Sequence, residues 1–236
     1  MSKEYSEENK HYYNNLDDLN SLHMTKGQLY ETIITTRTSI DANSFDSENK
    51  VKMNNAAPIG VLCKSPKQIV LYLYEGTHTI KNIHEKGEFI VNITQDPLIF
   101  TKSTLGDVDE DYFENYKGIP YFKNTDAFFV ARVENAKEIT RKNGFGSSKM
   151  SIVTANVEEI VQIKSNIMPL NRGIYAVIES LIHYTRLELA DKQTKDIYWQ
   201  RIKEMNRVAQ KVGSPQEKKA IQEIITNIKE NFKDLD

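Results

Sequence analysis

The order of secondary-structure signals along the chain is the strongest constraint on its fold. Six segments rich in β-branched and aromatic residues come first, and helical spacing dominates only after Pro169. Strands that precede helices, instead of alternating with them, favour an antiparallel sheet over a doubly wound parallel one. We therefore expect an antiparallel β-barrel followed by a C-terminal helical subdomain. The expected strands cover residues 28–37, 55–62, 68–74, 88–94, 126–136 and 149–163.

Composition divides the chain into three parts. Residues 1–24 are rich in Glu, Asn, Asp and Tyr without a sustained hydrophobic period, so we expect a disordered or loosely ordered lead-in. The barrel is expected over residues 25–168 and the helical subdomain over residues 169–236.

Helices are expected inside the barrel region as well as after it. One short helix is capped by Thr77 or Thr79 and ends at Gly87, and another opens at Asp96-Pro97. The subdomain helices are expected at residues 171–190, about 195–211 and 215–232. Loops or irregular segments are expected at 41–50, 107–118 and 141–148.

Charge and hydropathy exclude several classes of function. The chain has 31 Lys and Arg against 33 Asp and Glu, a net charge of −2, so it lacks the basic field of a nucleic-acid-binding protein. No run of about 18 apolar residues is present, so we expect no membrane span. The N-terminus is polar and acidic, unlike a signal or transit peptide, and we expect a cytoplasmic protein.

The histidines and the single cysteine, Cys63, do not form a metal-ligand pattern. One cysteine excludes an intramolecular disulfide and a Cys-rich zinc site, and no H-x-x-x-H spacing occurs among the five histidines. No G-x-S-x-G motif is present either. We expect no metal, and the sequence identifies no catalytic residue.

The segment EGTHTIKN (75–82) joins an expected strand to an expected helix. Gly76 permits close approach of the backbone, Thr77 and Thr79 offer hydroxyl groups, and Asn82 lies one turn further on. The first N–H groups of a helix are free and carry the positive end of its dipole, so this segment could bind a phosphate. An ordinary threonine N-cap would have the same sequence.

The segment NAAPIGV (55–61) reads as a strand with unusually small residues. Small side chains leave backbone groups accessible, and Pro58 removes one ladder donor, which suits an edge or a bulge. A flat ring could lie against such a strand. A tight barrel corner that requires small residues is the alternative.

The segment PLNRG (169–173) opens the first expected helix of the subdomain. Asn171 is a suitable N-cap, whereas Arg172 opposes the helix dipole in the first turn. A cation in that position indicates an anionic partner nearby. The partner could be a buried Asp or Glu or the phosphate of a ligand.

Taken together, these segments resemble the FMN-binding split barrels of the flavin-reductase type. The pairing of N-A-A-P-I-G with a downstream T-x-x-N-I and G-E-F-I-V-N carries the likeness, and an uncharacterised archaeal branch of that superfamily is more similar still. The resemblance covers about residues 27–190 and implies an antiparallel, Greek-key-like split barrel. Its hallmarks are LYETIITT (29–36), NAAPIGV (55–61), EGTHTIKNI (75–83), DPLIF (96–100) and NRGIYAVIESLIHYTR (171–186).

The resemblance implies FMN as cofactor, bound in a groove at the interface of a homodimer. By position, the flavin would be lined by Asn55, Ala56, Ala57, Pro58, Ile59 and Gly60. The phosphate would be held by Gly76, Thr77, His78, Thr79 and Asn82. Neighbours of the site would be Thr35, Thr36 and Arg37, with Asn171 and Arg172 closing it.

One departure from the flavin-reductase pattern concerns charge. Those proteins often carry a Lys-Asp pair just before the Thr, whereas this chain has Gly76-Thr77-His78. We therefore expect another cation, Arg172 or Arg186, near the phosphate.

The resemblance does not identify a substrate. It implies an FMN-dependent oxidoreductase or flavin reductase, with a reduced nicotinamide or deazaflavin as donor. A non-catalytic FMN carrier and an enzyme similar to pyridoxamine-phosphate oxidase are the alternatives.

Overall fold

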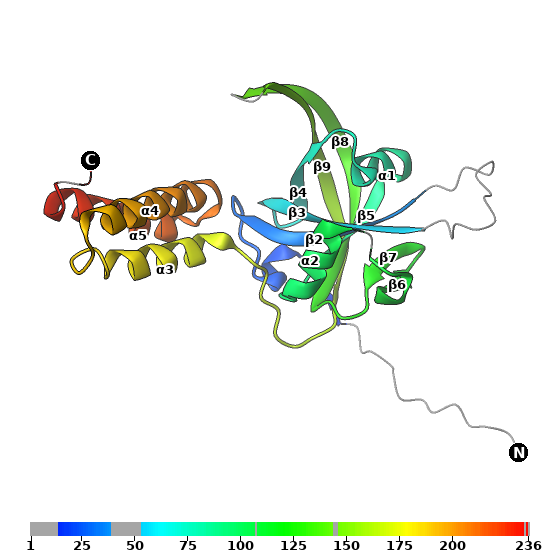
Figure 1. The fold of residues 1–236 in the computed structure, drawn as a ribbon. Coiled ribbons are helices and arrows are strands. Elements are labelled where there is room, and N and C mark those ends of the chain that lie inside the picture. Colours follow the sequence, from blue (N-terminus) through cyan, green and yellow to red (C-terminus); the bar gives the residue numbers. More distant parts are fainter. Residues whose placement is uncertain (1–13, 39–52, 107, 144–145, 234, 236) are drawn as a thin grey trace, which may run out of the picture.

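The computed structural model describes residues 14–38, 53–106, 108–143, 146–233 and 235, so the expected loop at 41–50 lies outside the described residues. Figure 1 shows a barrel with a three-helix arm on one side. The sheet order is β1-β9-β4-β3-β2-β5-β8, and β8 also pairs with β9, so six strands close into a barrel. These strands are β2 (Leu29–Arg37), β3 (Asn54–Ser65), β4 (Gln68–Tyr74), β5 (Glu88–Ile93), β8 (Ala127–Asn143) and β9 (Gly146–Gln162).

All the barrel strands pair antiparallel, which confirms the predicted fold class. The β8–β9 ladder runs from Ala127↔Gln162 to Asn143↔Gly146. The loop predicted at 141–148 is therefore wrong, because the two strands stay paired almost to its middle. Figure 1 shows this long hairpin extending well beyond the barrel.

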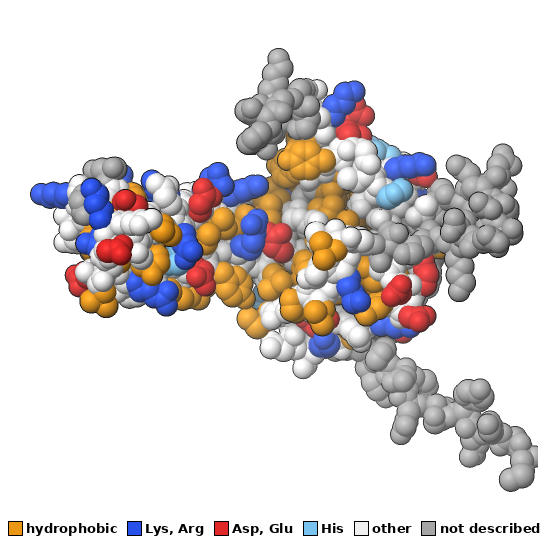
Figure 2. All heavy atoms as spheres, viewed as in Figure 1, with side chains coloured by type: hydrophobic (Ala, Val, Ile, Leu, Met, Phe, Trp, Pro, Cys, Tyr) orange, Lys and Arg blue, Asp and Glu red, His pale blue; other side chains and the backbone are white. Residues whose placement is uncertain are grey.

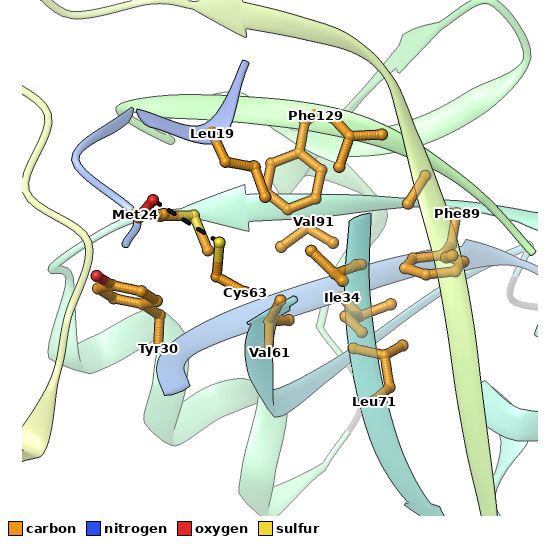
Figure 3. Close-up of a cluster of buried hydrophobic side chains, with 14 of the residues drawn as sticks. Leu19, Met24, Tyr30, Ile34, Val61, Cys63, Leu71, Phe89, Val91 and Phe129 are labelled. Carbon is orange, nitrogen blue, oxygen red and sulfur yellow. Dashed lines mark hydrogen bonds between the residues drawn. The ribbon is translucent and has the colours of Figure 1, made fainter. Parts of the chain in front are cut away.

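Alternate strand residues point inward and form the main core. Ile34, Val61, Leu71, Phe89 and Phe129 are fully buried in one contiguous cluster (Figure 3). This alternation follows from the two-residue period of a strand.

The segment before β2 closes one end of the barrel. It contains β1 (Asn14–Leu16), which pairs with β9, and the 3-10 helix η1 (Leu19–Leu22). Leu19, Leu22 and Met24 are completely buried in the main core, and Figure 3 places Leu19 and Met24 beside the barrel residues. The expectation of a disordered lead-in is thus wrong for residues 14–24, because three large apolar side chains anchor them.

The helix α1 (His78–Lys86) covers the opposite end of β3. Thr77 is its N-cap and Gly87, at φ +69°, its C-cap, as predicted. Ile80 and Ile83 are buried in the main core.

The outer face of β2 and β5 is covered by α2 (Pro97–Leu105), η2 (Glu110–Tyr112) and the hairpin of β6 (Phe113–Tyr116) and β7 (Ile119–Phe122). The rings of Phe113 and Phe122 stack with centroids 4.9 Å apart, in a cluster with Ile33 of β2. Residues 107–118 were expected to be irregular. The structure corrects this for 110–116, because Phe113 supplies an apolar anchor within an acidic stretch.

The C-terminal arm consists of α3 (Arg172–Tyr184), α4 (Lys192–Val212) and α5 (Pro215–Asn231), which confirms the three predicted helices. It has its own core, which includes Trp199, Ile202, Ile221 and Ile228. The first helix ends six residues earlier than expected, at Tyr184. No helix among the described residues is long and apolar enough to cross a membrane.

Candidate functional site

The strands β3 and β4 separate before the end of the barrel. Their ladder has its last pair at Val61↔Leu71. Beyond it, β4 continues along β9 to Tyr74, while β3 continues along β2 to Asn54. One edge of residues 54–60 therefore has no partner strand in the described ranges, and the barrel is split there.

The unpaired edge carries the small residues that the sequence analysis singled out. Side chains alternate along a strand, so Ala57 and Ile59 point inward, and Ile59 packs against the main core. Ala56, Pro58 and Gly60 point outward. All five residues are half-buried, so the strand surface here is neither covered nor fully open.

The backbone of this edge offers hydrogen-bonding groups to the split. The N–H of Cys63 donates to the carbonyl of Gln28, on the β2 side. Backbone groups alternate between the two edges of a strand, so the carbonyl groups of Ala56, Pro58 and Gly60 point toward the open edge, as do the N–H groups of Ala56 and Gly60. Pro58 loses no ladder hydrogen bond there, as expected of a proline at an edge.

The start of α1 lies next to the split. The side chain of Thr77 accepts a hydrogen bond from the N–H of Ile80 at 3.4 Å. The backbone N–H groups of His78 and Thr79 have no acceptor within the described residues, as is usual for a first helical turn. Gly76 (φ +86°), Thr77 and His78 are exposed. An anion at this position would meet free N–H groups and the positive end of the helix dipole.

A buried polar network fixes α1 to the ends of β2 and β3. The amide of Asn82 donates to the hydroxyl of Thr36 at 2.9 Å, and the amide of Asn55 donates to the hydroxyl of Thr79 at 2.9 Å. Asn55 also donates to Thr36 at 3.2 Å. Thr36, Thr79 and Asn82 are at most 2% exposed. These residues lie beneath the helix start and position it, and their side chains do not line its open surface.

Thr35 and Arg37 point to the β6–β7 hairpin. The buried hydroxyl of Thr35 donates to the carbonyl of Pro120 at 2.5 Å and accepts from the amide of Asn92 at 3.0 Å. The exposed guanidinium of Arg37 donates to the carbonyl of Gly118 at 3.3 Å. The structure therefore places these two residues on β2, which pairs with the closed edge of β3, and not at the split itself.

A groove of about 510 Å³ runs across the outer face of the barrel from the split to the helical arm. It adjoins the start of α1, because the hydroxyl of Thr77 donates to the carbonyl of Tyr74 at 3.4 Å. Its walls include Glu31, Gly60, Tyr72, Tyr74, Arg172 and Lys211.

The start of α3 forms one end of this groove. Asn171 is the predicted N-cap, and its side-chain oxygen accepts from the N–H of Gly173 at 2.7 Å. Its amide donates to the carbonyls of Leu29 and Val212, both at 2.8 Å. Arg172 pairs through Nε with Glu31 at 2.6 Å. The anionic partner of Arg172 is therefore a carboxylate, and it is only partly buried.

The structure separates the candidate residues into two groups. Glu31 and Thr36 are five residues apart on β2, which corresponds to about 17 Å. Arg172 thus lies far from the start of α1 within one chain, while Gly60 and Tyr74 connect the two groups. Arg186, the other expected cation, follows α3 at its end remote from the groove.

Sequence reasoning missed Glu31, Tyr72, Tyr74 and Lys211 as groove residues. The alternation in QIVLYLY places Tyr72 and Tyr74 on one face, and this was a usable signal. Nothing in the spacing of Glu31 and Lys211 predicts that they line the same groove. Within the described ranges, no group of His, Cys, Asp and Glu could hold a metal ion.

Two family models match the chain. The model described as "Protein of unknown function (DUF447) N-terminal domain" covers residues 30–164, and the one described as "Protein of unknown function (DUF447)" covers residues 171–226. An uncharacterized protein of Methanocaldococcus jannaschii is 32% identical over 167 residues, which is 70% of this chain and 77% of that protein.

The chain is also similar to solved structures. The FMN-bound protein of Methanosarcina mazei, assigned to the DUF447 family model, is 27% identical, with 89% of this chain and 99% of that chain covered and a TM-score of 0.47. The styrene monooxygenase flavin reductase of Pseudomonas putida S12 is 14% identical, with 60% and 85% covered and a TM-score of 0.40.

Proposed function

Because the chain belongs to the DUF447 family, we propose that it is a flavoprotein that binds FMN at the split between β3 and β4. We further propose that it acts as an FMN-dependent oxidoreductase or flavin reductase. The observation that carries the proposal is the unpaired edge of residues 54–60 beside the free N–H groups of α1. A protein assigned to the same family is described as FMN-bound.

The residues at the split fit the two halves of FMN. The terminal phosphate is a dianion, which suits the exposed first turn of α1 with its unpaired N–H groups at His78 and Thr79. The flat ring suits the open edge at Ala56, Pro58 and Gly60, where the side chains of the strand itself are small and its backbone can exchange hydrogen bonds with ring heteroatoms. Bound FMN supplies redox chemistry, and the protein determines its position and access.

The expected cation beside the phosphate does not come from Arg172 of the same chain in this proposal. Arg172 is paired with Glu31 and lies at the other end of the groove. His78 is exposed in the first turn of α1, and its imidazole can donate a hydrogen bond to the phosphate.

We also propose that a second copy of the chain covers the site. One face of α3 exposes large apolar side chains, each between 36% and 54% exposed: Ile174, Tyr175, Ile178, Leu181 and Ile182. A monomeric soluble protein rarely leaves a contiguous apolar stripe of this size uncovered. Figure 2 shows hydrophobic side chains along the arm and where the arm joins the barrel.

Light scattering on the purified protein tests the dimer. We expect a particle of about twice the chain mass of 27.2 kDa at micromolar concentration. A particle of 27.2 kDa would contradict it.

An absorption spectrum of the purified protein tests the flavin. We expect the two visible bands of an oxidised flavin, released by heat as FMN and not as FAD. Anaerobic addition of a reduced nicotinamide or a reduced deazaflavin should then bleach these bands if the protein is an oxidoreductase. Bands that persist with every donor would favour a non-catalytic FMN carrier, and a protein that takes up no flavin would overturn the proposal.

A further inference from the structure

We infer that the groove between the barrel and the helical arm binds a second ligand, a planar heteroaromatic ring bearing a phosphate, and that Arg172 and Lys211 recognise its negative charge. This inference rests on the proposed function, because the ligand would lie beside the flavin. It assigns a binding role to the helical subdomain, which contributes both cations.

The charge lining the groove is positive. Arg172 of α3 and Lys211 of α4 face the groove together with one carboxylate, that of Glu31. Lys211 has no ion-pair partner among the residues that the structure describes. In Figure 2, positive and negative side chains lie side by side where the arm meets the barrel, among hydrophobic ones. An anionic group of a ligand would balance the excess positive charge of Arg172 and Lys211 over Glu31.

Arg172 is oriented for such a role. A cation in the first turn of a helix opposes the dipole, so its position requires compensation. The 2.6 Å contact between its Nε and Glu31 provides that compensation and uses one edge of the guanidinium. The side chain is still 52% exposed, which leaves terminal N–H groups for a phosphate.

The opposite wall suits a ring. Tyr72 and Tyr74 alternate on the outer face of β4 and are 45% and 55% exposed, so their rings are accessible for stacking. The side chain of Leu29 packs over Gly60, where an added Cβ would lie 2.8 Å from Leu29 Cδ2, so this part of the groove floor is apolar. The volume of about 510 Å³ lies within the usual range for small-molecule sites.

The groove is continuous with the proposed flavin site. Gly60 belongs to the unpaired edge of β3, and the carbonyl of Tyr74 accepts a hydrogen bond from Thr77 at the start of α1. A ring stacked on Tyr72 or Tyr74 would therefore lie next to a flavin ring placed on residues 56–60. Nicotinamide nucleotides and phosphorylated deazaflavins both have the required chemistry.

The test measures equilibrium binding to the FMN-loaded protein, with oxidised probes so that no turnover occurs. The probes are NAD⁺, NADP⁺ and an oxidised, phosphorylated deazaflavin, each followed by calorimetry. We expect one of them to bind saturably and Lys211→Gln to weaken that binding about tenfold, since a charge-assisted hydrogen bond is lost. Arg172→Gln should weaken it at least as much. The identity of the probe that binds distinguishes the two sources of the ligand.

The matched control is Lys192→Gln. Lys192 is exposed on the same helix, 19 residues before Lys211 and about 29 Å away along the axis, so probe binding should not change. FMN affinity should be the same in Lys211→Gln as in the natural protein. No saturable binding of any probe, or equal effects of the two lysine substitutions, would overturn the inference while FMN binding stands. Failure to load FMN at all would overturn the proposed function instead.

Discussion

The two ends of β3 differ in pairing, in residue size and in what covers them. At Val61 and Leu62 the strand pairs with both β2 and β4, it continues along β4 to Ser65, and Val61 and Cys63 are buried. From Asn54 to Gly60 it pairs with β2 alone, and the residues are small and half-buried. The closed end has the residues of a packed core, whereas the open end leaves one edge of its backbone unpaired within the described residues, at the place where we propose that FMN binds.

The covers of the two ends differ in the same way. Leu19, Leu22 and Met24 fill the closed end with apolar side chains. At the open end, α1 is held by hydrogen bonds from Asn82 to Thr36 and presents free N–H groups to solvent. The closed end is therefore packed with apolar side chains, and the open end is the one that we propose for binding.

Proline substitutions should give the largest difference in stability between the two ends. Leu62→Pro removes a ladder donor from the doubly paired end, and we expect it to cost about 3 kcal/mol or more. Pro58→Ala at the open end should change stability by less than about 1 kcal/mol. Urea unfolding of both variants measures this, and similar losses would contradict the difference in pairing.

The second largest difference in stability should come from truncating an apolar side chain that covers the closed end. Leu22 is completely buried, so Leu22→Ala should destabilise the protein by about 2–5 kcal/mol through lost burial and a cavity. His78→Ala at the open end should change stability by about 0.5 kcal/mol or less, because the side chain is exposed. Thermal melts compare the two. A small loss for Leu22→Ala would show that residues 14–24 do not close the barrel.

The polar network at the open end should couple stability to binding. Asn82→Ala removes the shorter of the two amide hydrogen bonds to the buried Thr36 hydroxyl, and we expect a loss of about 1–3 kcal/mol together with weaker FMN binding. Lys81→Ala, next to it on the exposed face of α1, is the control and should change neither quantity. Unchanged FMN affinity in Asn82→Ala would show that the polar network does not contribute to FMN binding.

The N-cap of α1 should have the smallest effect on stability. Thr77→Ala should cost about 1 kcal/mol, and Thr77→Ser, which keeps the hydroxyl, should cost less. Denaturant unfolding resolves a difference of this size. Equal losses would mean that the hydroxyl does not cap the helix.

Much of the fold could be predicted, because local patterns determine it. Alternation and turn residues located the six barrel strands, and Thr77, Gly87 and Asn171 marked helix ends that the structure confirms. The β6–β7 hairpin was missed because Phe113 stands in an acidic stretch that has no strand pattern. The segment 14–24 was missed because Leu19, Leu22 and Met24 are too few to show a period.

The site could be predicted in part. The small residues at 56–60 and the helix start at Thr77 were recognised from residue type, yet the split that joins them depends on where β3 and β4 separate. Pairing between strands is a tertiary property, as is the contact of Arg172 with Glu31, 141 residues away in the chain. Asn82 was expected at the phosphate, but its amide bonds Thr36 because burial requires a partner.

Calorimetric titration of the flavin-free protein with FMN and with riboflavin tests the central claim most directly. The two ligands share the ring and differ in the phosphate that we place at the start of α1. Each charge-assisted hydrogen bond contributes about 1.5–3 kcal/mol, so two of them predict that FMN binds at least about 100-fold more tightly than riboflavin. Equal affinities for the two ligands would contradict the account, because the open end of the barrel would then not hold a phosphate.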